Sequence, residues 1–442
     1  MSDKKKINIL LLSGVNPYTD SGIWAYDIYK SLTQKGHSVL LLTQNHDERF
    51  EAGIESISGK QKWKSGAKSF RARCEWLYRL FIRKISYHSN KNKKRNPDFY
   101  MSILNEKKHH IPTEAILSHI RTKIDAIIYL FPHDFLDSKN LYELNRITNA
   151  PVFVMPVDMA SFTGGCHYAN NCENYKHHCG CCPGLYSSKA TDSTYKNLAY
   201  KKQFIQKTDA HTLGNTWTIN ALKQSHLYND KPSHYLDVVV DDSHYCPGNK
   251  QLAKEQFSIP NDKKIIFFGA SFLENKRKGL AYLVDALNQL YDEISEEERN
   301  EIGIAIAGNS GNGIDKLFRF EVFLLGHLSH QQLPDAYRMA DVFTSPSTQD
   351  AGPMMVIQSM MCGTPVVAFE MGNALDFIID GETGFKAPLY DTESLKKGIY
   401  SILIKTEPEK EEIAAQCREI AMKKSSYDSF EQIFISVYET AK

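Results

Sequence analysis

The sequence has no long apolar run and no excess of either charge. No segment of its 442 residues approaches the roughly 18 consecutive apolar residues typical of a membrane-spanning helix. The apolar run at Ile7–Leu12 is short and contains Asn8, so it predicts a buried strand rather than a signal peptide. Lys and Arg number 53 against 52 Asp and Glu, a balance that gives no general attraction to nucleic acid. We therefore expect a cytosolic globular protein with two or three domains.

Two kinds of sequence signature are also lacking. The chain contains neither the dinucleotide-binding pattern of three spaced glycines nor a Walker phosphate loop. Its nine cysteines are too few for a disulfide framework in a protein of this length. Any nucleotide site must therefore be built in another way.

Short apolar strands alternate with amphipathic helices along the whole chain. Buried β-branched runs separated by helices favour parallel sheets of the doubly wound kind. The predicted strands are Ile7–Leu12, Ser38–Leu42, Ala126–Leu130, Val152–Met155, Ile265–Phe268, Ile302–Ala307, Val322–Leu325, Val342–Thr344 and Val366–Ala368. The series is interrupted near residues 236–262, where the periodicity is lost and Pro247-Gly248 occurs. We predict two α/β domains with ligands at the carboxyl ends of their strands.

Loops that follow predicted strands carry the candidate ligand-binding residues. The first loop runs from Ser13 to Gly22, contains Gly14, and precedes a helix predicted over Ile23–Lys35. Its glycines would let the backbone approach a phosphate or a sugar closely. A plain strand-to-helix turn has the same pattern, so this loop alone does not predict a ligand.

A second loop begins at Gly269 and ends with three cations, Lys276, Arg277 and Lys278, directly before a helix that starts at Leu280. Cations at this position oppose the helix dipole, and an anionic ligand explains their presence. The planar fork of arginine and the point charge of lysine suit a diphosphate. A solvated basic turn is the alternative interpretation.

A third loop follows the strand at 342–344 and contains Asp350 and Gly352. Pro353 suits the first turn of a helix, and Gly352 permits close approach to the amides at the start of that helix. Asp350 and Gln358 would bracket the short helix. An acidic group and an amide placed in this way can hold the hydroxyls and the phosphate of one ligand.

Several motifs together resemble the retaining GT-B glycosyltransferases that build bacterial lipopolysaccharide, capsule and exopolysaccharide. They are Cys362-Gly-Thr-Pro-Val-Val-Ala368, Asp350-Ala-Gly-Pro-Met-Met355, Arg277-Lys-Gly279 and Gly381-Glu-Thr-Gly384. The resemblance covers nearly the whole chain and implies an α/β GT-B fold, in which two Rossmann-like doubly wound domains face a cleft. It implies an acceptor-side domain over 1–240, a donor domain over 241–425, and a C-terminal helix over 426–442 that packs back on the N-terminal domain.

The resemblance also implies roles for individual residues. Arg277 and Lys278 would bind the diphosphate of a nucleoside diphosphate sugar and stabilise the charge that develops as it leaves. Members of the family contact the donor sugar and the ribose with two glutamates, and the matching positions here are Asp350 and Gln358. The remaining donor-binding residues would be Gly14, Gly22, Gly269, Gly352, Met354 and Met355.

Asp158 is a further catalytic candidate under this resemblance. Family members usually carry a histidine before this aspartate, and here the position is Val157. Such transferases need no catalytic metal, and the sequence has no Asp-x-Asp of the metal-dependent kind.

Five of the cysteines fall between Cys166 and Cys182. Cys179 and Cys182 have a chelating spacing, and Cys166 and Cys172 would complete four soft ligands for a structural zinc ion. A similar insert with Gly-Gly-Cys-His-Tyr, here within 163–184, occurs in a subset of these transferases. Reduced free thiols and an iron–sulfur or redox site are the alternatives. His167, His177 and His178 are candidate substitute ligands, and exposed loop histidines are the alternative interpretation of these three residues.

Residues 60–95 carry 13 Lys or Arg against one acid, Glu75. Aromatic residues such as Trp63 and Phe81 interrupt these cations, a mixture that suits an interfacial helix on anionic lipid. A solvated basic helix with its aromatic residues in the core is equally compatible with the pattern. RNA binding is less favoured because no RNA-module signature accompanies the segment.

Together these observations predict a retaining glycosyltransferase on the inner face of the cytoplasmic membrane. It would move a sugar from a UDP or GDP sugar to a lipid-linked saccharide in O-antigen or capsule biosynthesis, without nucleic acid as a partner. The alternatives are a nucleotide-sugar epimerase or a phosphorylase of the same fold, and a non-catalytic partner that binds nucleotide sugar or saccharide.

Overall fold

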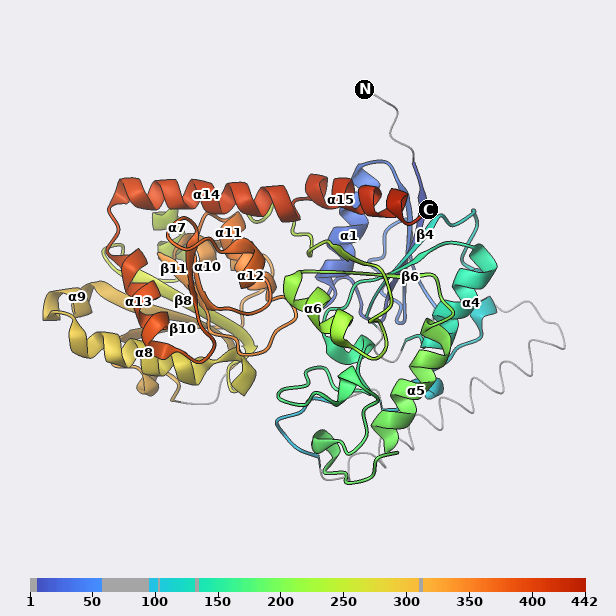
Figure 1. Cartoon of the computed structure of the whole chain (residues 1–442). Helices are drawn as coiled ribbons and strands as arrows, with labels where there is room; N and C mark the ends of the chain where they lie inside the picture. The colour runs from blue at the N-terminus through green and yellow to red at the C-terminus, as the bar shows by residue number, and fades with distance from the viewer. Residues whose placement is uncertain (1–5, 58–94, 102–103, 132–134, 310–312) are drawn as a thin grey trace. The chain divides into compact units, whose positions relative to one another are not determined.

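The computed structural model describes residues 6–57, 95–101, 104–131, 135–309 and 313–442 (Figure 1). The chain forms two compact units. The first consists of Met1–Ala25, His37–Thr212 and Leu222–Pro232, and the second of Tyr26–Gly36, Leu213–Ala221 and Ser233–Lys442. The domain bounds at 240 and 425, and the packing of residues 426–442 on the N-terminal domain, stay predictions.

In the described part of the chain, the first sheet has seven strands in the order β3-β2-β1-β4-β5-β6-β7. β1 pairs in parallel with β2 and β4, and β4, β5 and β6 continue in parallel. The strands are β1 (Asn8–Ser13), β2 (Ser38–Thr43), β3 (Ile54–Ser56), β4 (Ala126–Phe131), β5 (Val152–Val154), β6 (Ala210–Gly214) and β7 (Ser233–Tyr235). Consecutive residues of β1, β5 and β6 are buried, because helices and loops cover both faces of a doubly wound sheet.

The second sheet has six strands among the described residues, in the order β10-β9-β8-β11-β12-β13. All pairings between these neighbouring strands are parallel. The strands are β8 (Lys264–Phe272), β9 (Ile302–Asn309), β10 (Glu321–Gly326), β11 (Val342–Ser345), β12 (Val366–Phe369) and β13 (Gly384–Ala387). β11 and β12 are buried along their whole length, so the core of this unit lies around the centre of the sheet.

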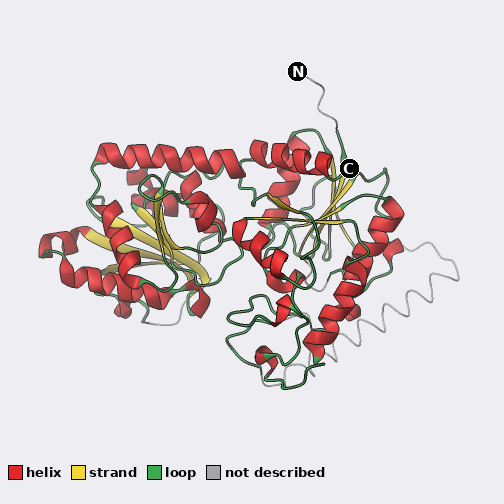
Figure 2. Cartoon of the chain, in the orientation of Figure 1, coloured by secondary structure: helices red, strands yellow, loops and turns green. Residues whose placement is uncertain are grey.

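Helices connect the strands of both sheets, as Figure 2 shows. They are α1 (Ile23–Gln34), α3 (Thr113–Leu117), α4 (Ser138–Thr148), α5 (Ser193–Ile205), α6 (Thr216–Gln224), α7 (Lys250–Gln256), α8 (Leu280–Glu293), α9 (Glu296–Glu301), α10 (Leu333–Arg338), α11 (Met354–Met361), α12 (Ala374–Phe377), α13 (Thr392–Leu403), α14 (Glu407–Ser425) and α15 (Tyr427–Thr440). In the second unit α8 packs with α13, and α11 packs with α10 and α14.

The sequence-based strand predictions are confirmed, since each of the nine predicted strands overlaps an observed one. The helix predicted over Ile23–Lys35 is α1, and it ends before Gly36, whose φ is +85°. Pro353 precedes α11 as its N-cap, one residue earlier than predicted. Four strands were missed, namely β3, β6, β7 and β13, because each is short and lacks a continuous apolar run.

The basic segment at 60–95 lies outside the described residues except for Arg95, whose guanidinium donates to the Met101 carbonyl at 2.8 Å. The predicted membrane contact of this segment therefore stays a prediction. Among the helices that the structure does describe, none combines the length and the apolar character needed to cross a bilayer.

Candidate functional site

The loop after β8 forms a tight turn that presents two cations. Residues Lys276–Lys278 form a 3-10 turn, which begins where the Asn275 side chain accepts the Arg277 amide N–H at 3.4 Å. Gly279 follows with φ of +78°, and a Cβ atom there would lie 1.8 Å from the Pro346 carbonyl oxygen. Only glycine allows this approach, which brings the turn against the loop after β11.

Asp350, in the loop after β11, binds both cations through one oxygen. Its Oδ2 accepts from Lys278 Nζ at 2.5 Å and from Arg277 Nη1 at 3.0 Å, while Oδ1 accepts from the Gly352 amide at 3.4 Å. Burial alone would raise the pKa of Asp350, but the charges of Lys278 and Arg277 outweigh burial and hold this pKa below its ordinary value. The three side chains form a cluster of two positive charges and one negative charge, in which Asp350 is buried and the two cations are partly exposed.

The two cations line a cavity of about 240 Å³ at the carboxyl ends of β8 and β11. Gly269, Met354 and Met355 line the same cavity. The first amides of α11 have no partner within the helix, so its N-terminus adds positive potential beside the cations. This arrangement can hold a doubly charged anion such as a diphosphate.

Side chains distant in the sequence hold the loop that carries Asp350. Asn215 Nδ2 and Thr218 Oγ1 donate to the Ala351 carbonyl at 2.7 and 2.9 Å. Gly352 is so closely surrounded that a Cβ atom would lie 3.1 Å from Asn373 Oδ1. Asn215, Thr218 and Asn373 were not predicted from the sequence, because none of them belongs to a local motif.

This part of the chain is similar to a known family. Residues 249–423 match the family described as "Glycosyl transferases group 1". We call residues 249–423 the group 1 domain, after the family that they match. The Arg277-Lys278 turn, Asp350, the start of α11 and the 240 Å³ cavity all lie within this domain.

Individual relatives match part of the chain, and solved structures match nearly all of it. A D-inositol 3-phosphate glycosyltransferase of Mycobacteroides abscessus is 26% identical over 193 residues, which cover 40% of this chain and 41% of that protein. The chain thus spans about two fifths of the length of this relative. Sucrose-phosphate synthase from Thermosynechococcus elongatus is 16% identical, with a TM-score of 0.67 over 98% of this chain and 99% of that one.

Anabaena Alr3699/HepE in complex with UDP and glucose is 14% identical, with a TM-score of 0.59 over 98% of this chain and 100% of that one. Together with the two parallel sheets, these likenesses confirm the predicted GT-B fold.

Three predicted site residues of the group 1 domain, Asp350, Gly352 and Gln358, are not among the residues that line the cavity. Gln358 is 4% exposed, and its Oε1 accepts from the Tyr337 hydroxyl of α10 at 2.9 Å. The side chain therefore joins α10 to α11. Its contact with a ribose stays a prediction.

Gly14 and Gly22 flank the loop after β1, outside the group 1 domain. A Cβ atom on Gly22 would lie 1.9 Å from the Asn16 carbonyl oxygen, so the loop needs glycine for its own packing. Gly14 directly follows β1, which ends at Ser13, and so stands at the carboxyl edge of the first sheet. The donor contact of both glycines stays a prediction.

Asp158 lies in the loop after β5, at the same edge of the first sheet. Its Oδ1 accepts from the Ala160 amide at 2.7 Å, and its Oδ2 lies 2.5 Å from His167 Nδ1. Both side chains are buried, so Asp158 caps a short turn and orients the imidazole. The contact between His167 and Asp158 was not predicted from the sequence, because no local motif connects the two residues. The catalytic role of Asp158 stays a prediction.

The four predicted zinc ligands, Cys166, Cys172, Cys179 and Cys182, line one small cavity of about 20 Å³. All four are free thiols. Within the described ranges, however, no three His, Cys, Asp or Glu side chains are arranged to hold a metal ion. The fold gathers the four cysteines, but the geometry of their side chains gives no support to a zinc ion.

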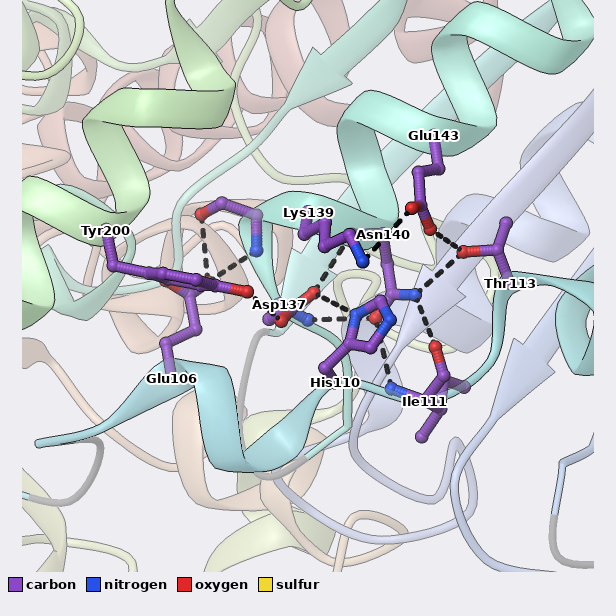
Figure 3. A network of polar contacts seen from close by, with 10 residues as sticks. Glu106, His110, Ile111, Thr113, Asp137, Lys139, Asn140, Glu143 and Tyr200 are labelled. Atoms are coloured by element: carbon purple, nitrogen blue, oxygen red, sulfur yellow. Dashed lines mark hydrogen bonds and ion pairs between the residues drawn. The ribbon is translucent and has the colours of Figure 1, made fainter. Parts of the chain in front are cut away.

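A buried polar network holds the start of α4 at the carboxyl edge of the first sheet (Figure 3). Glu106 Oε1 accepts from the amide and the hydroxyl of Ser138 at 2.8 and 2.9 Å. Asp137, the N-cap of α4, lies 3.0 Å from His110 Nδ1 and accepts from the Tyr200 hydroxyl at 2.7 Å. The side chains of Glu106 and Asp137 therefore accept from backbone amides at the N-terminus of this helix, from within the protein. No sequence motif marked this network.

Proposed function

We propose that the chain is a retaining glycosyltransferase that moves a sugar from a nucleoside diphosphate sugar to a saccharide acceptor. The observation that carries this proposal is the cavity of the group 1 domain, where Arg277, Lys278 and the N-terminus of α11 lie together. The bound UDP and glucose of Alr3699/HepE, a protein of the same fold, are consistent with such a donor.

The residues of the cavity suit the departure of a diphosphate. Negative charge develops on the diphosphate as its bond to the sugar breaks, and fixed positive groups stabilise that charge without reorganising. Lys278 supplies a compact charge, and Arg277 supplies a planar set of donors. Asp350 cancels one of the two positive charges in the free protein and holds both side chains in place. The protein thus orients the donor and stabilises the leaving group.

A thermal-shift titration tests this function with UDP, GDP, ADP and their common sugar conjugates. One nucleotide and its sugar conjugate should raise the melting temperature of the wild-type protein. The double variant Arg277→Ala/Lys278→Ala should lose that response. Lys276→Ala is the matched control, because Lys276 is a cation of the same turn that does not line the cavity. A wild-type protein that is folded and responds to no nucleotide would refute the proposal.

One observation favours a second candidate, a non-catalytic protein that binds nucleotide sugar. Both residues predicted to contact the donor sugar and ribose are engaged within the protein, Asp350 by two cations and Gln358 by Tyr337. Chromatography of reaction products separates the possibilities. A transferase releases nucleoside diphosphate when an acceptor is present, an epimerase converts the donor sugar without an acceptor, and a binding protein does neither.

We further propose that the acceptor is a lipid-linked saccharide of a bacterial surface polysaccharide, handled at the cytoplasmic face of the membrane. The motif resemblance and the basic character of residues 60–95 support this acceptor. Co-sedimentation with vesicles of phosphatidylglycerol, compared with vesicles of phosphatidylcholine, tests the membrane contact. Equal binding to both vesicles, or to neither, would refute an electrostatic attachment.

A further inference from the structure

Phe272 exposes its ring within the cavity of the group 1 domain. It is the last residue of β8, it lines the cavity together with Arg277 and Lys278, and it is 66% exposed. Phe268 and Phe343 line the same cavity but are 2% and 1% exposed, so their rings belong to the core. Of these three aromatic residues, only Phe272 can present the face of its ring to a ligand.

A β-bulge directs Phe272 out of the sheet. Gly269 pairs with Ala307, and Phe272 pairs with Asn309, so three steps along β8 match two steps along β9. Such bulges bend a strand and change the direction of its side chains. The bulge depends on Gly308, whose φ is +142°. A Cβ atom there would lie 1.9 Å from a carbonyl oxygen of β8.

Hydrogen bonds hold the end of β8 beyond the bulge. Asn309 Nδ2 donates to the Ser271 carbonyl at 3.1 Å, and the Leu273 amide donates to the Asn309 carbonyl at 3.1 Å. These bonds flank Phe272 on both sides. Its backbone is therefore held in place before any ligand arrives, which lowers the entropy lost on binding.

We propose that Phe272 stacks on the nucleobase of the donor, an inference that rests on the proposed function. The cations and the α11 amides match the diphosphate, and the sugar offers mainly hydroxyl groups. Phe272 has no hydrogen-bonding side-chain atom, so it suits the one planar, weakly polar part of the donor, which is the base. Stacking on an aromatic ring depends little on the identity of the base, because every base has a π-face. Phe272 thus strengthens binding and leaves the choice of base to other groups.

Calorimetric titration tests this contact with three ligands: inorganic pyrophosphate, the nucleoside diphosphate that stabilises the wild-type protein, and its sugar conjugate. Phe272→Ala should lower the affinity for the nucleoside diphosphate and for its sugar conjugate about tenfold, which is the size of a typical stacking contact. The affinity for pyrophosphate should not change. Phe272→Tyr keeps the ring and should bind like the wild type. Leu324→Ala is the matched control, because Leu324 of β10 is 52% exposed and does not line the cavity.

Three results would overturn the inference. An equal loss of affinity for pyrophosphate and for nucleotide would show that the substitution disturbs the diphosphate site at the two cations. Loss of affinity for the sugar conjugate alone would place the ring on the transferred sugar. Unchanged binding of every ligand would show that the ring makes no contact. Each of these results requires a wild-type protein that binds a nucleotide, whereas the proposed function itself fails when no nucleotide binds the wild type.

Discussion

Replacing Glu106 with glutamine should abolish a defined part of the pH dependence of stability. Glu106 is 4% exposed, and in the part of the chain that the structure describes its Oε2 has no hydrogen-bond partner. Its pKa is raised from an ordinary value of 4.5 to about 7, mainly by burial, and the nearby charge of Asp137 acts in the same direction. The charge of Lys201 and the hydrogen bonds from Ser138 lower this pKa, without cancelling the effect of burial.

The direction of the effect follows from proton linkage. The folded protein keeps the Glu106 proton up to about pH 7, whereas the unfolded chain releases it near pH 4.5. Between these values the folded state binds more protons, so the free energy of unfolding falls as the pH rises. The difference between the two pKa values corresponds to about 3 kcal/mol, which the wild-type protein loses between pH 4.5 and pH 7.

Urea unfolding at pH 5, 6, 7 and 8 measures this loss. Glu106→Gln keeps an acceptor for Ser138 and cannot ionise, so the variant should gain about 3 kcal/mol relative to the wild type between pH 5 and pH 8. Burial also raises the pKa of Asp237 to about 7. Asp237 therefore gives both proteins the same change of unfolding free energy with pH, and this change cancels in the comparison. Glu114→Gln, at an exposed carboxylate of α3, controls for the loss of negative charge. A stability difference between Glu106→Gln and the wild type that is the same at every pH would refute the reasoning.

Further predictions concern the loops and the cysteines. Asp350→Asn leaves two cations without their shared anion and should lower the free energy of unfolding by about 3 kcal/mol. Nucleoside diphosphate should then raise the melting temperature of this variant more than that of the wild type. An unchanged melting temperature of the variant without ligand would contradict this prediction. Gly279→Ala should prevent folding of the loop after β8, because a Cβ atom at this position would lie 1.8 Å from a carbonyl oxygen. Gly381 is the matched control, since it also has a positive φ but has open space around it. In the same thermal melt, Gly381→Ala should lower the free energy of unfolding by only about 1 kcal/mol. Elemental analysis should find about one zinc per chain if the four clustered cysteines bind the ion, and a folded, metal-free protein would reject the zinc prediction.

Much of the cavity in the group 1 domain was predictable from the sequence, because the signals that mark its residues are local. The cations of the Arg277-Lys278 turn, and a glycine directly after them, stand within a few residues of one another. Strand, loop and helix follow in immediate succession there, so residues near in sequence are also near in space. Met354 and Met355 were found in the same way, since a short helix starts beside them.

The contacts that hold the site were not predictable, because they join residues far apart in the chain. Asn215 reaches Ala351 across 136 positions, and no pattern near either residue indicates the pairing. The same holds for Glu106 and Ser138, which meet only when the loops at one edge of the first sheet are assembled. Hydrogen bonds of this kind depend on the arrangement of several elements, and a periodic pattern of apolar residues carries no information about them.

The sequence by itself determined the doubly wound α/β architecture, the nine main strands and the identity of the two cations, because hydrophobic period and local turn chemistry specify them. Only the tertiary structure decided how the side chains are used. It joined both cations to one oxygen of Asp350, turned Gln358 toward Tyr337, and brought His167 to Asp158. It also exposed Phe272 through a bulge, since the register of two strands is decided by their packing and not by either strand alone.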